Sequence, residues 1–285
     1  MQKSFKETKP TLYVVSTPIG NLKDMTLRAL EVLKEVDFIL AEDTRKSGVL
    51  LHHFSIKKPM RSYHEFNKSE QENMILNALS EGKSIALISD AGTPGISDPG
   101  FEIIKKVSES GYHVVPVPGA SAILAALVTS GLIIQPFTFI GFLPKKVGEM
   151  TELLSSYQGR KETLVIYESP NRIEKSMKTL YECLGNRKIA IARELTKTFE
   201  TIIRTDLKEA QTMEHATKGE YVIVIEGTKE VPIVYHETLK DHVIRLILAG
   251  MDEKEAIKKV AKDRGLSKQE VYRAVKIDED AFIEP

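Results

Sequence analysis

Apolar and polar residues alternate along this chain in blocks that predict strands followed by helices. Short apolar runs bounded by glycine, proline or charged residues indicate buried strands. Amphipathic stretches between them indicate helices packed on a sheet. We expect strands at 12–16, 37–41, 60–63, 85–88, 114–117, 137–144 (with its exit turn), 163–167, 189–192, 199–204 and 221–225. We expect helices at 26–36, 69–80, 101–108, 123–129, 147–157, up to 184, 207–216, 236–249, 252–263 and 267–276.

This alternation favours an α/β fold with a mainly parallel first sheet, followed by a second α/β unit and a small helical module. The last two helices, joined by a turn with Gly265, resemble a helix-turn-helix pair. The predicted organisation is a disordered N-terminal tail (1–10), an N-terminal α/β domain (11–135), a second α/β domain (136–230), a C-terminal helical module (236–277) and an acidic tail (278–285).

Composition adds little to this picture, because 40 basic residues balance 40 acidic ones and the net charge points to no partner. Locally, seven basic residues and two acidic ones lie between Lys258 and Lys276. Such a basic face is typical of phosphate contact. A solvated helical face packed on the core is the alternative.

The single cysteine, Cys183, excludes an internal disulfide and a multi-cysteine metal site, and it fits a reducing cytoplasm. Residues 1–10 lack the apolar stretch of a signal peptide. The longest apolar runs, such as 120–127, are too short to span a bilayer. We therefore expect a soluble cytoplasmic protein with no membrane partner, and we assign no metal-binding residues.

The stretch from Leu87 to Gly100, LISDAGTPGISDPG, follows a predicted buried strand and contains three glycines, two prolines and two aspartates. Glycine lets the backbone approach a ligand, and proline stiffens the loop. Loops between a strand and a helix usually run about two to six residues. We interpret this longer one as a binding loop, with a plain connection as the alternative. The next helix is expected to start near Asp98 or Pro99, with Asp98 as its N-cap.

Two further loops suggest what is bound. Residues 118–122 (PGASA) follow another strand and open a helix, where Ser121 could hydrogen-bond a ligand; tight packing also explains the small residues there. Residues 17–22 (TPIGNL) lack the GxGxxG spacing, and the chain has no Walker A motif. The pattern thus disfavours NAD and nucleoside triphosphates and favours an enzyme with a nucleoside-type or small anionic ligand.

Charged residues gather directly after three predicted strands, at Glu42–Lys46, Glu168–Arg172 and Arg193–Lys197. A helix N-terminus explains the acids of the first group but not its basic residues, which would lie near the positive end of the helix dipole. We interpret these groups as facing a substrate. An ion pair between domains is the alternative for each residue.

Seven motifs occur in an order that resembles the tetrapyrrole-methylase superfamily, and within it the branch that acts on ribosomal RNA. The resemblance covers about residues 11–276. The motifs are TPIGNL (17–22), AEDTR (41–45), SDAGTPGISDPG (89–100), PGASA (118–122), GFLP (141–144), YESPNRI (167–173) and ARELTK (192–197).

The resemblance implies a two-domain methylase that binds S-adenosyl-L-methionine, forms a homodimer and 2′-O-methylates the ribose of a cytidine in 16S rRNA of the small ribosomal subunit. The chain has SDA where many tetrapyrrole methylases have GGDP, and TPIGN where they have GxGPG. These departures fit the RNA branch rather than a porphyrinoid substrate.

The cofactor-binding residues are carried over by position in the motifs, whereas the catalytic and substrate-binding residues are charged and polar groups near the ends of predicted strands. The expected cofactor-binding residues are Pro18, Ile88, Asp90, Thr93, Pro94, Ser121, Ala122, Glu168 and Leu195. The expected catalytic residues are Glu168, Glu194, Arg193 and Lys197, with Glu168 or Glu194 accepting the proton. The expected substrate-binding residues are Glu42, Asp43, Arg45, His64, Asn171, Arg172 and Glu200.

Two alternatives stay open. A methylase acting on a tetrapyrrole or another small molecule would share the cofactor loops. A non-enzymatic RNA-binding or assembly protein could have kept the fold, although it would be expected to have degenerate cofactor loops.

Overall fold

The computed structural model describes residues 2–4, 9–64, 68–228, 237–264 and 266–276. The chain divides into two compact units, Met1–Lys229 and Glu230–Pro285, which are described separately. The predicted acidic tail at 278–285 and residues 5–8 of the predicted N-terminal tail lie outside the described residues. Within the described part of the chain, no helix combines the length and apolar character needed to cross a membrane.

A five-stranded parallel sheet opens the first unit, with strand order β3-β2-β4-β1-β5. The central strands β2 and β4 are short, fully buried apolar runs, as the pattern predicts, whereas the edge strand β3 has the sequence MRS. The strands are β1 (Thr11–Val15), β2 (Phe38–Ala41), β3 (Met60–Ser62), β4 (Ile85–Ile88) and β5 (His113–Val117).

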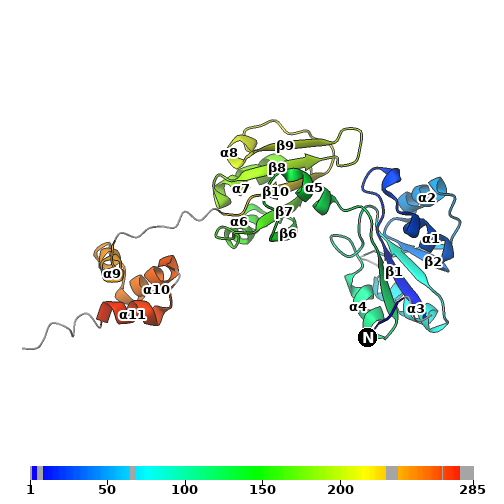
Figure 1. Cartoon of the computed structure of the whole chain (residues 1–285), viewed down its shortest axis with the longest axis horizontal. Coiled ribbons are helices and arrows are strands. Elements are labelled where there is room, and N and C mark those ends of the chain that lie inside the picture. The colour runs from blue at the N-terminus through cyan, green and yellow to red at the C-terminus, as the bar shows by residue number, and fades with distance from the viewer. Residues whose placement is uncertain (1, 5–8, 65–67, 229–236, 265, 277–285) are drawn as a thin grey trace, which may run out of the picture. The chain divides into compact units, whose positions relative to one another are not determined.

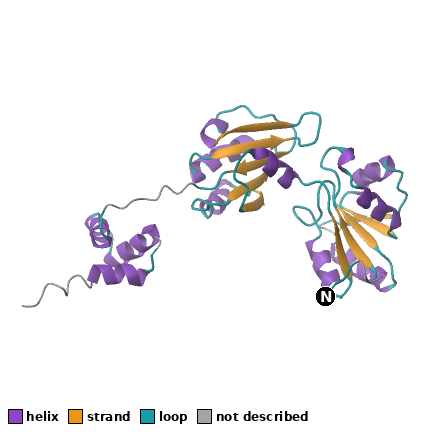
Figure 2. Ribbon diagram, viewed as in Figure 1, coloured by secondary structure: helices purple, strands orange, loops and turns teal. Residues whose placement is uncertain are grey.

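Helices cover both faces of this sheet, as Figures 1 and 2 show. Alternate residues of each strand face opposite sides. Ile39 and Ala41 of β2 pack with helices α1 and α2, whereas Phe38 and Leu40 pack with α3 and α4. These elements are η1 (Leu22–Asp24), α1 (Leu27–Glu35), α2 (Thr44–His53), α3 (Lys68–Ser80) and α4 (Phe101–Glu109).

A second five-stranded sheet completes the first unit, with strand order β6-β7-β10-β8-β9. Its first pair, β6 and β7, is parallel, but β10 lies antiparallel between β7 and β8, and β9 is antiparallel to β8. The strands are β6 (Phe137–Phe142), β7 (Thr163–Glu168), β8 (Lys188–Arg193), β9 (Thr201–Asp206) and β10 (Tyr221–Ile225).

The two faces of the second sheet are covered unequally. Helices α6 (Val147–Ser155), α7 (Ile173–Leu184) and α8 (Leu207–Ala210) bury one face in the larger core of this half. The opposite face packs against α5 (Ala122–Ser130), which follows β5 and so comes from the first half of the chain.

The second unit contains α9 (Leu239–Leu248), α10 (Glu253–Arg264) and α11 (Lys268–Lys276), packed around a core of their own. Ser267 and Glu270 form a capping box at the start of α11. The Ser267 N–H donates to Glu270 at 2.8 Å, and the Glu270 N–H donates to the Ser267 hydroxyl at 3.3 Å.

Three local expectations were wrong. Helix α4 begins at Phe101 with Gly100 as its N-cap, not Asp98, and no side chain caps it. Helix α8 ends at Ala210 instead of reaching 216, because the buried ring of His215 hydrogen-bonds the Ala210 carbonyl at 2.8 Å. Strand β9 begins at Thr201 instead of 199, since Lys197 to Glu200 form a turn.

Candidate functional site

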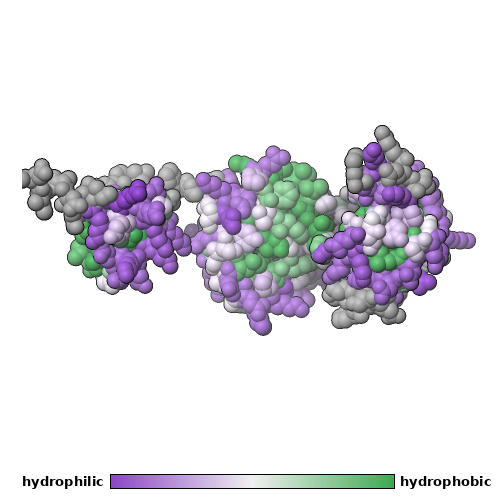
Figure 3. Space-filling model, turned by 90° about the horizontal axis from the view of Figure 1, so that it is seen from below, coloured by the Kyte–Doolittle hydropathy of each residue, from purple (hydrophilic) through white to green (hydrophobic). Residues whose placement is uncertain are grey.

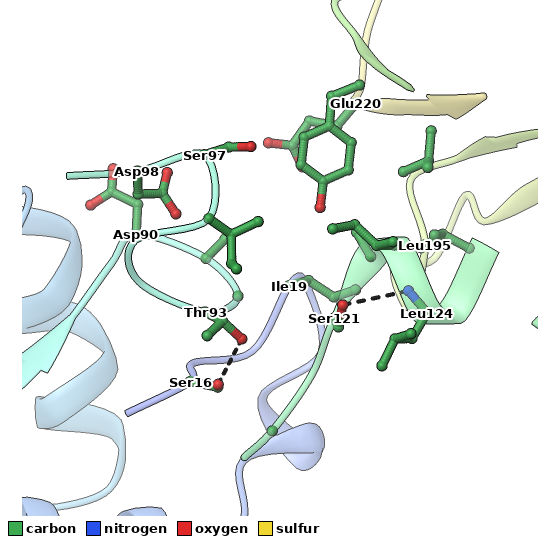
Figure 4. Close-up of a pocket in the computed structure, with 18 of the residues that line it drawn as sticks. Ser16, Ile19, Asp90, Thr93, Ser97, Asp98, Ser121, Leu124, Leu195 and Glu220 are labelled. Carbon is green, nitrogen blue, oxygen red and sulfur yellow. Dashed lines mark hydrogen bonds between the residues drawn. The ribbon is translucent and has the colours of Figure 1, made fainter. Parts of the chain in front are cut away.

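A cavity of about 760 Å³ lies within the first unit and is lined by loops and strand ends of both sheets (Figure 4). Ligand pockets usually have about 300–1,000 Å³. The first sheet contributes the loops that follow β1, β2, β4 and β5. Because all its strands are parallel, their carboxyl ends meet at one edge, where ligands of open α/β sheets bind.

The loops that follow β1 and β4 are joined to each other. The Thr17 N–H donates to the Gly92 carbonyl at 2.8 Å, and the Gly92 N–H donates back to Thr17 at 3.1 Å. The hydroxyls of Ser16 and Thr93 lie 2.8 Å apart, as the dashed line in Figure 4 shows. Gly92 has a φ of +80°, a conformation that favours glycine. These contacts hold the SDAGTPG loop over the cavity.

The loop that follows β5 also approaches β1 closely. A Cβ atom on Gly119 would lie 2.9 Å from the Cβ of Ser16 and 3.3 Å from its carbonyl oxygen. Glycine is therefore required there by space. Next to it, the Ser121 hydroxyl accepts the Leu124 N–H at 3.4 Å, so Ser121 is the N-cap of α5.

Asp90, expected to bind a cofactor, lines the cavity and also joins two loops. Its carboxylate accepts the Asp43 N–H at 3.2 Å and the Lys46 ammonium at 2.6 Å. The hydrogen bond with Asp90 raises the pKa of Lys46. These two contacts fix the Asp90 side chain between the loops that follow β2 and β4.

Asp98 lies beside Asp90 in Figure 4 and is half-buried. Because Gly100 is the N-cap of α4, the Asp98 carboxylate does not cap this helix. Burial, together with the negative charges of Glu42 and Asp90, raises the pKa of Asp98 to about 6, although a hydrogen bond with Ser89 opposes the rise. Sequence reasoning assigned Asp98 only a capping role and missed this position.

The second sheet supplies a more apolar wall, with Leu195, Val222 and Tyr167 among the lining residues. Leu195 and Val222 belong to the core cluster that α5 covers. Burial and the charge of Asp98 raise the pKa of Tyr167 to about 12, so its hydroxyl keeps its proton and can donate.

Glu220 and Tyr221 also line the cavity, and sequence reasoning did not identify them. They lie at the amino end of β10, where Tyr221 pairs with Glu168 of β7 and with Arg193 of β8. An antiparallel strand brings its beginning to the edge where its neighbours end. A search for polar residues after strands therefore overlooks them.

Lys197 forms ion pairs with two glutamates, Glu194 and Glu220, and we call these three residues the ion-pair bracket. The Lys197 ammonium lies 2.9 Å from Glu194 and 2.9 Å from Glu220. Although burial works against it, hydrogen bonds with Glu220 and Glu194 raise the pKa of Lys197, and the hydrogen bond with Lys197 lowers the pKa of Glu194. Both groups are charged at neutral pH. Because the pKa of Glu194 is lowered, its carboxylate is a weaker base than a free carboxylate.

Glu168 lines the cavity, yet its side chain is fully buried. Its carboxylate accepts the Ser176 hydroxyl at 2.5 Å and the Ser169 N–H at 2.8 Å, and it lies 3.4 Å from Arg172. The same Arg172 donates to the carbonyls of Leu143 and Pro144. These contacts hold the YESPNR turn together and satisfy both oxygens of Glu168.

The expected site residues thus fall into two sets. The cavity brings together Glu42, Asp90, Thr93, Ser121, Ala122, Glu168 and Leu195. Outside its lining lie Pro18, Ile88, Asp43, Arg45, His64, Pro94, Asn171, Arg172, Arg193, Glu194, Lys197 and Glu200.

Several residues in the second set have identifiable local partners. Asp43 caps α2 and pairs at 2.7 Å with Arg45, whose side chain is 89% exposed; hydrogen bonds with Arg45 lower the pKa of Asp43. Arg193 donates to the Lys218 carbonyl at 2.9 Å. Glu200 accepts the Thr196 N–H at 2.6 Å. Their roles toward a substrate stay predictions.

The charged side chains of the cavity lining are mainly acidic. Its charged members are five carboxylates and one lysine, namely Glu42, Asp90, Asp98, Glu168, Glu220 and Lys46. A negative lining favours a cationic sulfonium and ammonium and disfavours a polyphosphate. Apolar residues from the second sheet, among them Leu195 and Val222, form the opposite part of the lining. The described residues contain no cluster of His, Cys, Asp or Glu placed to hold a metal ion.

Comparison with known proteins agrees with this geometry. Residues 11–211 match the family described as Tetrapyrrole (Corrin/Porphyrin) Methylases. A Bacillus subtilis protein named ribosomal RNA small subunit methyltransferase I is 46% identical over 97% of this chain and 98% of its own. A Halalkalibacterium halodurans protein of the same name is 45% identical over 94% and 95%.

Solved structures show the same fold. Uroporphyrin-III-C-methyltransferase from Thermus thermophilus has a TM-score of 0.56 at 17% identity, covering 76% of this chain and 94% of that one. A diphthine synthase has a TM-score of 0.58 at 13% identity, covering 76% and 90%. These two likenesses concern the fold alone.

Proposed function

The chain belongs to the tetrapyrrole (corrin/porphyrin) methylase family, and from this premise we propose that it is an S-adenosylmethionine-dependent methyltransferase acting on small-subunit ribosomal RNA. More specifically, we propose that it methylates the ribose 2′-oxygen of a cytidine in 16S rRNA. The observation that carries this is near full-length similarity, at 46% identity, to a relative named for that RNA. The negatively lined cavity supports the cofactor part of the proposal.

In this proposal, the cofactor binds in the cavity with its polar end at the first sheet. Asp90 and Thr93 on the loop after β4, and Ser121 at the start of α5, contact the cofactor. Leu195 and Val222 pack against its base. S-adenosylmethionine supplies a methyl group on a positively charged sulfur, which needs no further activation. The task left to the chain is to align the ribose oxygen with the methyl group and to take up its proton.

The negative lining also limits what part of the RNA enters. The carboxylates of the lining that have no ion-pair partner, Glu42 and Asp98, repel phosphates, so the backbone phosphates stay outside while one ribose reaches in. Basic residues elsewhere supply the phosphate contacts. We propose that the basic residues of α10 and α11, including Lys258, Lys262 and Arg273, do so.

We also propose that the protein acts in the cytoplasm as a homodimer. Several apolar side chains on α5 and around β6 are exposed: Leu124 (55%), Val128 (70%), Ile133 (72%), Phe137 (40%) and Phe142 (56%). Figure 3 shows apolar surface gathered over this part of the molecule. Exposed apolar patches of this kind mark interaction surfaces.

The dimer is tested by Val128→Asp, which places a charge in the centre of this surface and should yield monomers in light scattering after size exclusion. Val49→Asp is the control, because Val49 is equally exposed (73%) but lies on α2. A Val128→Asp variant of unchanged mass would contradict this interface.

The activity is tested by transfer of a labelled methyl group from S-adenosylmethionine to intact small ribosomal subunits, naked 16S rRNA and a porphyrinogen. Label in alkali-resistant dinucleotides of the rRNA is expected, because 2′-O-methylation blocks alkaline cleavage. Label in the porphyrinogen alone would favour a tetrapyrrole methylase instead. Binding of rRNA without any transfer would favour a non-enzymatic RNA-binding protein.

A further inference from the structure

The carboxylates that line the cavity differ in whether a cation neutralises them. Asp90 pairs with Lys46 at 2.6 Å, Glu168 lies 3.4 Å from Arg172, and Glu220 pairs with Lys197 at 2.9 Å. Among the described residues, Asp98 and Glu42 form no ion pair with lysine, arginine or histidine, although Glu42 interacts electrostatically with Lys46. An uncompensated, half-buried carboxylate in a ligand cavity costs stability and is a feature of functional sites.

Of these two residues, Asp98 is the one whose position in the cavity suits it to accept a proton from a substrate. Glu42 is turned toward the neighbouring loop, where it lies 3.5 Å from the Asp90 N–H. Asp98 lines the cavity directly and is half-buried there. The stiff DPG segment holds it at the first-sheet side of the cavity, next to Asp90 (Figure 4).

The groups that face Asp98 keep its carboxylate basic. Glu42 and Asp90, which follow β2 and β4, are negatively charged neighbours, and Tyr167 of β7 interacts with it as a neutral hydroxyl. Lys46, the cation among the lining residues, is already paired with Asp90. Burial and the two acidic neighbours raise the pKa of Asp98 to about 6. At pH 7–8 it is ionised, yet it is a stronger base than an ordinary carboxylate.

We propose that Asp98 is the general base of the methyl transfer, in place of the expected Glu168 or Glu194. This inference rests on the proposed function. The 2′-oxygen forms a bond to the methyl carbon while the carbon–sulfur bond breaks, and the sulfur keeps the bonding electron pair as a neutral thioether. The hydroxyl proton passes to the Asp98 carboxylate, so charge and atoms balance.

The structure also explains why the two expected bases are less suited. The carboxylate of Glu168 is fully buried and its oxygens already accept hydrogen bonds from Ser176 and Ser169. The carboxylate of Glu194 is held by Lys197, which lowers its pKa, and it lies outside the cavity lining. Asp98 alone among the three combines access to the cavity with a raised basicity.

The test uses the full-length chain with Asp98→Asn, which keeps the shape of the side chain but cannot accept a proton as a carboxylate does. Single-turnover methyl transfer to small ribosomal subunits should slow by about 10²–10⁴-fold, the usual contribution of a general base. The affinity for S-adenosylmethionine, measured by calorimetry, should change by less than about threefold. Asp24→Asn, on the exposed η1, is the matched control and should retain full activity.

Two pH measurements separate a base from a structural residue. The rate of the unaltered protein should rise with pH and level off above about 6, because the base must be ionised. Glu42→Gln should move that rise to lower pH, since the charge of Glu42 raises the pKa of Asp98. Independently of activity, the carboxyl carbon resonance that Asp98→Asn removes should titrate near pH 6 without cofactor.

The outcomes divide cleanly. An Asp98→Asn variant that transfers methyl at the normal rate, or whose loss of rate is matched by lost cofactor affinity, overturns the assignment of Asp98 while the proposed function stands. A carboxyl resonance that titrates near pH 4 also overturns it. If the unaltered chain transfers methyl to no acceptor, the proposed function fails and the inference fails with it.

Discussion

The two sheets of the first unit contribute to the same cavity in different ways. In the parallel sheet, every strand ends at the same edge, so the loops after β1, β2, β4 and β5 all reach the cavity. In the second sheet, β10 runs opposite to β7 and β8, so the edge contains the ends of two strands and the beginning of a third. Sequence order therefore identifies site residues in a parallel sheet more readily than in an antiparallel one.

The sheets also differ in the chemistry they offer. The first sheet supplies polar loops with close backbone approaches and carboxylates, and the second supplies an apolar wall with a charged bracket at its rim. This division suits a ligand with a charged end and a flat apolar end. Asp98→Asn should have the largest effect, on the reaction rate. The substitutions below test the contrast between the polar loops of the first sheet and the apolar wall of the second, in order of decreasing expected effect.

Gly119→Ala tests whether the loops of the parallel sheet form the cofactor cradle. The added Cβ would lie 2.9 Å from Ser16, so the loop 118–122 must move away from β1. We expect the dissociation constant for S-adenosylmethionine to rise about tenfold or more, equivalent to at least about 1.4 kcal/mol. Calorimetric titration measures it.

Gly148→Ala provides the control, since a Cβ on Gly148 in α6 would meet nothing within 4 Å. Equal cofactor affinity in the two glycine variants would show that the cradle tolerates a shift of this loop, and the polar role of the first sheet would then be in doubt.

Lys197→Met tests the bracket at the rim of the second sheet. Loss of the ammonium removes the ion-pair partner that Glu194 and Glu220 share. The free energy of unfolding should fall by about 1–2 kcal/mol at pH 7.5, measured by urea denaturation. Lys105→Met, whose exposed ion pair spans 3.8 Å, should change it far less.

The sign of the pH dependence follows from the shifts. Because the pKa of Glu194 is lowered from 4.5 in the folded state, its pairing stabilises the protein above pH 4.5 and ceases to do so as the pH falls through the lowered value. The raised pKa of Lys197 keeps the ammonium charged throughout that range. The effect of Lys197→Met should therefore shrink as the pH falls from 4.5 through the lowered pKa of Glu194; an effect that stays equal in size would mean lost packing rather than lost charge.

Asp98→Asn should have a small and opposite effect on stability. The pKa of Asp98 is raised from 3.8 to about 6, so the folded state favours its neutral form. Its contribution to stability is present below pH 3.8 and is lost as the pH rises through about 6. Removing the charge should therefore stabilise the first unit at pH 8 by about 1 kcal/mol, allowing for solvent screening of a half-exposed group.

This stabilisation corresponds to a rise of about 2–4 °C in the unfolding midpoint at pH 8 for a unit of this size. The rise should disappear at pH 4, where the native carboxyl is protonated. A lower midpoint at pH 8 would show that Asp98 supports the fold, as a capping or hydrogen-bonding residue would, and would weaken its assignment as a functional base.

Much of the architecture was predictable because its signals are local. The four-residue apolar runs at β2 and β4 are buried on both sides, as expected of central parallel strands. The boundaries of α3 and α11 fall within one residue of the prediction. The errors arise where a distant contact decides the outcome: α8 ends at Ala210 because His215 takes its carbonyl.

The sequence by itself determined the alternation of strands and helices, the long loop between Leu87 and Gly100, and the motifs that place the chain in its family. These properties depend on residues close together in the chain. Only the tertiary structure decided which charged side chains form ion pairs with each other. Asp90 and Lys46 are 44 positions apart, and Lys197 and Glu220 are 23 apart. Pairing across such separations depends on the order and direction of strands, and it is this pairing that leaves Asp98 without a cation.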